Sequence, residues 1–178
     1  MSDRDRLLDL LRSRSFARKK VTLASGKESD FFIDVKQTAL TAEGHALIGS
    51  LMFAALTDHF KPSAVAGVEL GGCSLASAVS LVSFTKGFPL DALYVRKEAK
   101  DHGSKRLIEG DTHLSKGARI AIVEDVTTTG GSAIRAAARL RDAGYEVAGV
   151  LSLVDRLEGG SEAMHHASIP FRSIYTRT

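Results

Sequence analysis

Residues 118–132 have the sequence ARIAIVEDVTTTGGS, and this stretch indicates both the fold and the kind of ligand. An apolar run from Ile120 to Val123 ends in two adjacent carboxylates, Glu124 and Asp125. A turn rich in hydroxyl groups and glycine follows, and then an alanine-rich stretch with helical character. This order predicts a buried strand that leads into the N-terminus of a helix, where backbone N–H groups can bind phosphate.

The two acids beside this phosphate loop are unusual, because carboxylates repel phosphate. They fit a ligand that presents neutral hydroxyl groups next to its phosphate, such as a ribose. Successive side chains of a strand point to opposite faces, so both acids can reach one ligand only if the chain leaves strand geometry there. The alternative is an ordinary strand–turn–helix in which the acids are solvated and Ser132 caps the helix.

Helical and strand-like segments alternate along most of the chain. Helices are expected at residues 4–14, 42–60, 74–85 and 132–143, and strands at 21–23, 31–35, 65–68, 92–95, 119–123 and 147–154. The first two strands should flank a turn at residues 25–26. The alternation predicts an α/β fold with a mainly parallel, doubly wound sheet, whose ligands bind beyond the carboxyl ends of the strands.

Composition limits the class of protein. A chain of 178 residues with 44% hydrophobic residues fits one globular domain, residues 1–178, with a sizeable core. The single cysteine, Cys73, excludes an intramolecular disulfide and fits a reducing compartment. No apolar run approaches the roughly 20 residues of a membrane span, and no signal peptide is evident, so a cytoplasmic protein without a membrane partner is expected. The net charge of +3 is too small to indicate nucleic-acid binding.

Positive charge gathers between Tyr94 and Glu109. This segment contains one histidine, His102, and five other basic residues: Arg96, Lys97, Lys100, Lys105 and Arg106. A solvated loop is the ordinary explanation of such a run. A functional explanation is that a departing polyphosphate needs cations to neutralise its developing charge. Gly103 and Gly110 could then allow the segment to open and close over a site.

Two common nucleotide-binding patterns are absent from the sequence. It contains neither GxxxxGK[ST] nor GxGxxG, which argues against a P-loop NTPase and against the usual dinucleotide site. The phosphate loop must therefore use backbone amides and the hydroxyl groups of its threonines and Ser132.

Residues 118–132 resemble the signature of the type I phosphoribosyltransferases, which bind phosphoribosyl pyrophosphate. In that family the adjacent acids bind the ribose hydroxyls and the loop binds the 5′-phosphate. Residues 94–103, with the sequence YVRKEAKDHG, resemble the mobile catalytic loop of the orotate phosphoribosyltransferases, which reaches into the neighbouring subunit's site. The resemblance implies the type I phosphoribosyltransferase fold, a small N-terminal hood over roughly residues 1–40, and a homodimer with shared active sites.

The resemblance also implies roles for individual residues. The catalytic residues would be Arg96, Lys97, Lys100 and His102, and the histidine could also carry a proton. Phosphoribosyl pyrophosphate would contact these four and the following residues: Lys27, Glu124, Asp125, Val126, Thr127, Thr128, Thr129, Gly130, Gly131 and Ser132.

Orotate would bind beside a second group of residues that the resemblance indicates: Phe31, Phe32, Thr128 and Arg156. Aromatic faces suit a flat pyrimidine, and a planar guanidinium can bind a carboxylate through two parallel hydrogen bonds. The structural alternatives are one buried and one surface phenylalanine, and a surface ion pair for Arg156.

The chain departs from the family's pattern at residues 69–72, which read ELGG. Some relatives have an aromatic–lysine pair there that contacts pyrophosphate, and the backbone amides of Gly71 and Gly72 could replace it. Leu157 stands where a polar residue is expected, and Asp30 where a small residue or proline is expected. None of these differences removes a residue that the chemistry requires.

The expected reaction transfers ribose 5-phosphate from phosphoribosyl pyrophosphate to orotate, giving orotidine 5′-monophosphate and pyrophosphate, in de novo pyrimidine biosynthesis. Mg²⁺ would bridge pyrophosphate and ribose oxygens, and no side chain is assigned as its direct ligand. One alternative is a phosphoribosyltransferase for a purine or for uracil. Another is a non-catalytic regulator that senses phosphoribosyl pyrophosphate, although the N-terminal helix is too short for a helix-turn-helix domain.

Overall fold

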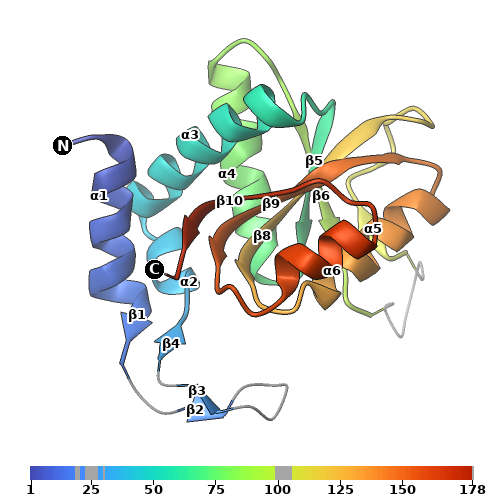
Figure 1. The fold of residues 1–178 in the computed structure, drawn as a ribbon. Coiled ribbons are helices and arrows are strands. Elements are labelled where there is room, and N and C mark those ends of the chain that lie inside the picture. Colours follow the sequence, from blue (N-terminus) through green and yellow to red (C-terminus); the bar gives the residue numbers. More distant parts are fainter. Residues whose placement is uncertain (19–20, 23–27, 30, 99–105, 178) are drawn as a thin grey trace.

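The computed structural model describes residues 1–18, 21–22, 28–29, 31–98 and 106–177 (Figure 1). The helices are α1 (Asp3–Leu10), α2 (Lys36–Ala39), α3 (Ala42–His59), α4 (Gly71–Thr85), α5 (Gly131–Asp142) and α6 (Gly160–His166), with a π-helical turn, η1 (Leu11–Ser15), directly after α1. The strands are β1 (Phe16–Ala17), β2 (Val21–Thr22), β3 (Glu28–Ser29), β4 (Phe32–Ile33), β5 (Ala64–Val68), β6 (Asp91–Val95), β7 (Ile108–Glu109), β8 (Arg119–Thr127), β9 (Glu146–Asp155) and β10 (Phe171–Thr176).

The described residues form a six-stranded central sheet with the order β10-β9-β8-β5-β6-β7. All neighbouring strands run parallel except β6 and β7, so the predicted mainly parallel α/β sheet is confirmed. The expected central strands and the three long helices are present, with ends shifted by a few residues. The elements outside the sequence-based expectations include the short helices α2 and α6 and the strands β1, β3, β7 and β10.

Side chains of β8 alternate between two hydrophobic clusters, one on each face of the sheet. Ile120 and Ile122 pack with residues of α5 and α6, whereas Ala121 and Val123 pack with residues of α3 and α4. All four side chains are fully buried. The sheet is therefore covered by helices on both faces, which is the doubly wound arrangement (Figure 1).

The N-terminal segment packs beside the C-terminal strand. The hydroxyl group of Tyr175 on β10 donates a 2.7 Å hydrogen bond to the carbonyl of Arg4, and the Arg4 guanidinium lies 5.0 Å above the same tyrosine ring. β1 pairs antiparallel with β4, and β2 pairs antiparallel with β3. The two expected N-terminal strands are present in shorter form as β2 and β4, whereas the turn predicted at residues 25–26 lies outside the described residues.

Among the described residues, none of the helices combines the length and the apolar character that a membrane crossing requires.

Candidate active site

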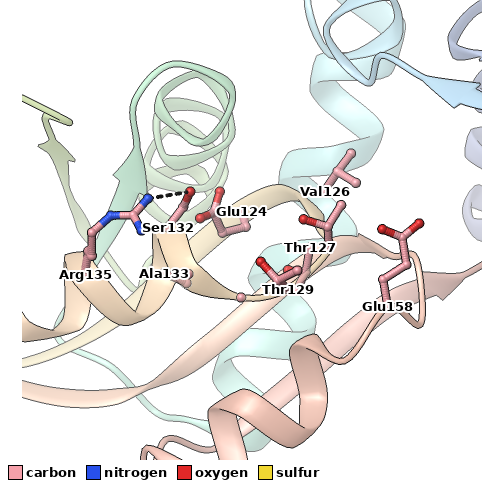
Figure 2. Close-up of a pocket in the computed structure, with 11 residues that line it drawn as sticks. Glu124, Val126, Thr127, Thr129, Ser132, Ala133, Arg135 and Glu158 are labelled. Carbon is pink, nitrogen blue, oxygen red and sulfur yellow. Dashed lines mark hydrogen bonds between the residues drawn. The ribbon is translucent and has the colours of Figure 1, made fainter. Parts of the chain in front are cut away.

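A cavity of about 380 Å³ lies where β8 ends and α5 begins (Figure 2). Its lining contains Glu124, Val126, Thr127, Thr128, Thr129, Gly130, Gly131, Ser132, Ala133, Arg135 and Glu158. The structure thus brings together all of the residues predicted from 124 to 132 except Asp125. The cavity lies beyond the carboxyl end of a central strand, where ligands of doubly wound sheets bind.

The N-terminus of helix α5 lies in the wall of this cavity. Gly130 is the N-cap of α5 and has a φ of +80°, a left-handed conformation that glycine adopts without steric cost. A Cβ atom at this position would also lie 3.1 Å from the Cε atom of Met164. The first amides of α5 have no carbonyl partner within the helix, so they can donate hydrogen bonds to an anion.

Hydroxyl side chains also line this cavity. Thr128, Thr129 and Ser132 lie in its wall beside the first amides of α5. Hydroxyl groups and helix N-terminal amides can both donate hydrogen bonds to an oxyanion. Together they make the cavity suitable for a phosphate.

The carboxyl group of Glu124 has a raised pKa in this cavity. Its side chain is buried, and burial raises the pKa from 4.5 to about 8, with a smaller contribution from the neighbouring Asp125. The positive charges of Lys97 and Arg135 oppose this rise. The Lys97 ammonium and the Arg135 guanidinium therefore lie close enough to the Glu124 carboxyl group to affect its pKa.

The raised pKa predicts a pH dependence of stability. Between about pH 4.5 and 8 the folded protein holds a proton on Glu124 that the unfolded chain has released, so stability falls as pH rises through this range. Glu124→Gln should remove this loss, which we expect to be on the order of 1–3 kcal/mol. Thermal unfolding midpoints between pH 6 and 9 check it, with the exposed Glu162→Gln as the matched control. Equal pH slopes in all three proteins would contradict the assignment.

Asp125 lies on the other face of β8 from Glu124. Its carboxylate occupies the space beside Gly71, where a Cβ atom would lie 2.0 Å from Asp125 Oδ2. The Val126 amide donates a 2.9 Å hydrogen bond to Oδ1, and burial raises the pKa of Asp125 while the Lys36 ammonium lowers it. The chain keeps strand geometry at the acids, because β8 continues to Thr127, so the condition under which both acids would face one ligand is not met. Gly71 leaves room for Asp125 on that face.

The basic segment begins next to the phosphate cavity. Lys97 lines a neighbouring cavity of about 250 Å³ together with Ser132 and Arg135. The Arg96 Nη1 atom lies 4.0 Å from Glu109 Oε1 on β7. The structure therefore places Lys97 beside the predicted phosphate loop. Three further predicted residues lie outside the described part of the chain: Lys27, Lys100 and His102.

Two of the predicted orotate residues are in direct contact. The Arg156 guanidinium lies 4.3 Å from the centre of the Phe31 ring, and both residues line a third cavity of about 270 Å³. Phe31 is 6% exposed and Phe32 is 38% exposed, so one phenylalanine is buried and the other lies at the surface. Thr128 lines the phosphate cavity and not this one.

Arg156 is almost completely buried, at 5% exposure, so it is not a surface ion pair. Its Nε and Nη2 atoms lie 2.9 and 2.8 Å from the same carboxylate oxygen of Glu158. Glu158 also lines the phosphate cavity, so this side chain links the two cavities. Figure 2 shows Glu158 across the cavity from Arg135.

Sequence reasoning missed Arg135 and Glu158. Arg135 extends from the first turns of α5, and its Nη2 atom lies 3.5 Å from Ser132 Oγ (Figure 2). Its spacing of three from Ser132 places both on one face of a helix, and this spacing is a usable signal. Glu158 follows Arg156 by two residues in a loop, where sequence spacing gives no comparable signal.

Comparisons with known proteins identify the family of the chain. Residues 36–174 match the family model described as "Phosphoribosyl transferase domain". The chain is 65% identical to the orotate phosphoribosyltransferase of Sorangium cellulosum over 176 residues, which cover 99% of this chain and 92% of that relative.

Solved structures of orotate phosphoribosyltransferases are also similar to this chain. The Mycobacterium tuberculosis orotate phosphoribosyltransferase in complex with Fe(III) dicitrate aligns with a TM-score of 0.84 at 40% identity, covering 99% of this chain and 97% of the other. The complex of that enzyme with phosphoribosyl pyrophosphate aligns with a TM-score of 0.80 at 38% identity, covering 98% and 96%. The chain belongs to the orotate phosphoribosyltransferase family.

Proposed function

We propose that this chain, an orotate phosphoribosyltransferase, binds the 5′-phosphate of phosphoribosyl pyrophosphate in the cavity of Figure 2 and transfers the ribose 5-phosphate group to orotate. The products are orotidine 5′-monophosphate and pyrophosphate, as in pyrimidine biosynthesis. The observation that carries the site assignment is the N-terminus of α5, whose first residues line this cavity together with Thr128, Thr129 and Ser132. Glu124 lines the same cavity and would accept hydrogen bonds from the ribose.

The chemistry requires little from a general base. Orotate is an anion and can attack the ribose carbon directly as the bond to pyrophosphate breaks, so charge stabilisation and positioning dominate. Lys97, together with Arg96, Lys100 and His102 from the family resemblance, would neutralise the leaving pyrophosphate. Exclusion of water from the site would protect the ribosyl cation that develops in the transition state.

Mg²⁺ is part of the proposal. Among the residues that the structure describes, no group of three or more His, Cys, Asp and Glu side chains could hold a metal ion. Mg²⁺ would supply positive charge that neutralises the leaving pyrophosphate, and substrate oxygens would be its main ligands. Glu124 lines the cavity and could assist by binding the ribose hydroxyls or metal-bound water. The family resemblance implies the same role for Asp125, which lies on the other face of β8.

Removing the metal should abolish the reaction. We expect less than about 1% of the rate when excess EDTA is present, because the cations of the chain cannot alone neutralise the pyrophosphate charge. Adding MgCl₂ in excess over EDTA should restore the full rate. The rate of orotate loss measures both states, and an undiminished rate in EDTA would contradict a role for Mg²⁺.

A homodimer with shared active sites and a cytoplasmic location complete the proposal. Three large apolar side chains are well exposed on or just after α4, as expected for a surface that a second subunit covers: Leu81, Phe84 and Phe88. The single cysteine fits a reducing compartment. Mixed dimers of two inactive variants, described in the Discussion, test whether the sites are shared.

A further inference from the structure

The backbone of Arg96 and Lys97 is held by side chains from two other elements. β5 and β6 pair in parallel as far as Val68 and Val95, and the Glu69 amide then donates a 2.9 Å hydrogen bond to the Val95 carbonyl. In a continuing parallel ladder the Lys97 amide would donate to the Glu69 backbone carbonyl. Instead it donates to the Glu69 carboxylate, at 2.9 Å from Oε2.

The carboxylate of Glu69 therefore replaces a backbone acceptor at the point where β5 ends. The chain turns away immediately afterwards, because α4 begins at Gly71. A charged acceptor makes a stronger hydrogen bond than a neutral carbonyl. The ladder between the two strands is thus extended by one step, and that step reaches Lys97.

Arg139 on α5 holds the same two residues from the other side. Its Nη1 atom donates to the carbonyl of Arg96, and its Nη2 atom donates to the carbonyl of Lys97 at 2.7 Å. A planar guanidinium can serve two acceptors at once, which a lysine ammonium cannot do with the same fixed geometry. The peptide groups around Lys97 are consequently bound by one anionic and one cationic side chain.

This arrangement determines where the side chain of Lys97 lies. Lys97 lines a cavity with Ser132 and Arg135, and its charge lowers the pKa of Glu124. It therefore lies beside the phosphate loop on one side and the predicted ribose-binding acid on the other. A shift of its backbone would move the ammonium group away from both.

We propose that Glu69 and Arg139 are positioning residues, which hold the backbone of Arg96 and Lys97 so that the Lys97 ammonium meets the leaving pyrophosphate. The inference rests on the proposed function, because it assumes that pyrophosphate leaves at this place. It also explains how an acidic residue is tolerated in the segment where some relatives carry a lysine: its charge is directed to a backbone amide and not to the substrate.

Substitutions at Glu69 separate positioning from simple stability. Glu69→Ala should lower kcat by roughly 10-fold, because the charge-assisted hydrogen bond to the Lys97 amide is lost. The KM for orotate should stay within about 2-fold of the wild-type value, because this bond lies away from the predicted orotate site. Glu69→Gln should recover kcat to within about 3-fold of the wild type, since the amide oxygen can accept the same bond. Thermal unfolding midpoints of both variants show whether each is folded at the assay temperature.

Substitutions at Arg139 test the second contact. Arg139→Lys and Arg139→Met should lower kcat by a similar factor of roughly 10, because neither side chain can bind both carbonyls. The double variant Glu69→Ala with Arg139→Met should be slowed by less than the product of the single effects, since both act on the same backbone. Arg172→Lys, an exposed arginine on β10, is the matched control and should retain the wild-type rate.

The outcomes distinguish this inference from the proposed function. Wild-type kcat in Glu69→Ala or Arg139→Met would overturn the inference, as would a Glu69→Gln variant as slow as Glu69→Ala. A lower unfolding midpoint with an unchanged kcat per folded protein would also overturn it, because the role would then be structural. A folded wild-type protein without activity toward orotate would instead overturn the proposed function, and this inference with it.

Discussion

Replacing Lys100 by alanine is expected to lower kcat by roughly 100-fold or more, while the affinity for phosphoribosyl pyrophosphate falls much less. The family resemblance implies that the loop that carries this lysine acts mainly on the leaving pyrophosphate. An interaction that forms chiefly in the transition state lowers kcat when it is lost, but has little effect on ground-state binding. Steady-state kinetics and a direct measurement of the dissociation constant give both quantities. Equal losses in turnover and binding would argue against a catalytic role.

Mixing this variant with a second inactive one tests whether the sites are shared. If Lys100 acts in the partner's site, a dimer of one Lys100→Ala subunit and one Asp125→Asn subunit has one intact site. Random mixing makes half of the dimers mixed, and one of their two sites is intact, so recovery to about a quarter of the wild-type rate is expected. The two variants assayed separately are the controls. No recovery in verified mixed dimers would contradict shared sites.

Arg156→Lys is expected to raise the KM for orotate by roughly 100-fold, while the KM for phosphoribosyl pyrophosphate changes by less than about 3-fold. Arg156 is buried, and its guanidinium lies against the ring of Phe31. A lysine keeps the charge but cannot bind a carboxylate through two parallel hydrogen bonds. The effect should therefore appear mainly in the binding of the base.

The control for this variant is Arg172→Lys, because Arg172 is exposed on β10 and lies outside the cavities described above. Initial rates over a range of orotate concentrations provide the comparison. An unchanged KM for orotate in Arg156→Lys would show that the carboxylate binds elsewhere. Unfolding midpoints are measured in parallel, since Arg156 also contacts Glu158.

Much of the fold follows from local sequence patterns. The apolar run from Ile120 to Val123 predicts a buried central strand, and the structure buries all four side chains. The pattern could not show that β8 continues to Thr127, because charged residues ordinarily mark the end of a buried strand. Neither could it show β10, a strand at the sheet edge whose pairing with β9 depends on tertiary packing.

The site also combines residues that local sequence identifies with residues that only tertiary packing brings together. The phosphate loop is contiguous in sequence, so its residues could be identified together, and the structure gathers most of them around one cavity. Glu69 and Arg139 are far apart in the chain, and only the packing of α5 and β5 beside β6 brings them to Lys97. The opposite placement of Glu124 and Asp125 follows from strand alternation once the length of β8 is known.

The most direct test is the absorbance of orotate after phosphoribosyl pyrophosphate and MgCl₂ are added to the purified protein. The account predicts that orotate absorbance falls while pyrophosphate is released in equal amount. Parallel assays contain uracil, adenine or hypoxanthine in place of orotate. A folded protein that leaves orotate unchanged but consumes one of these other bases would contradict the account.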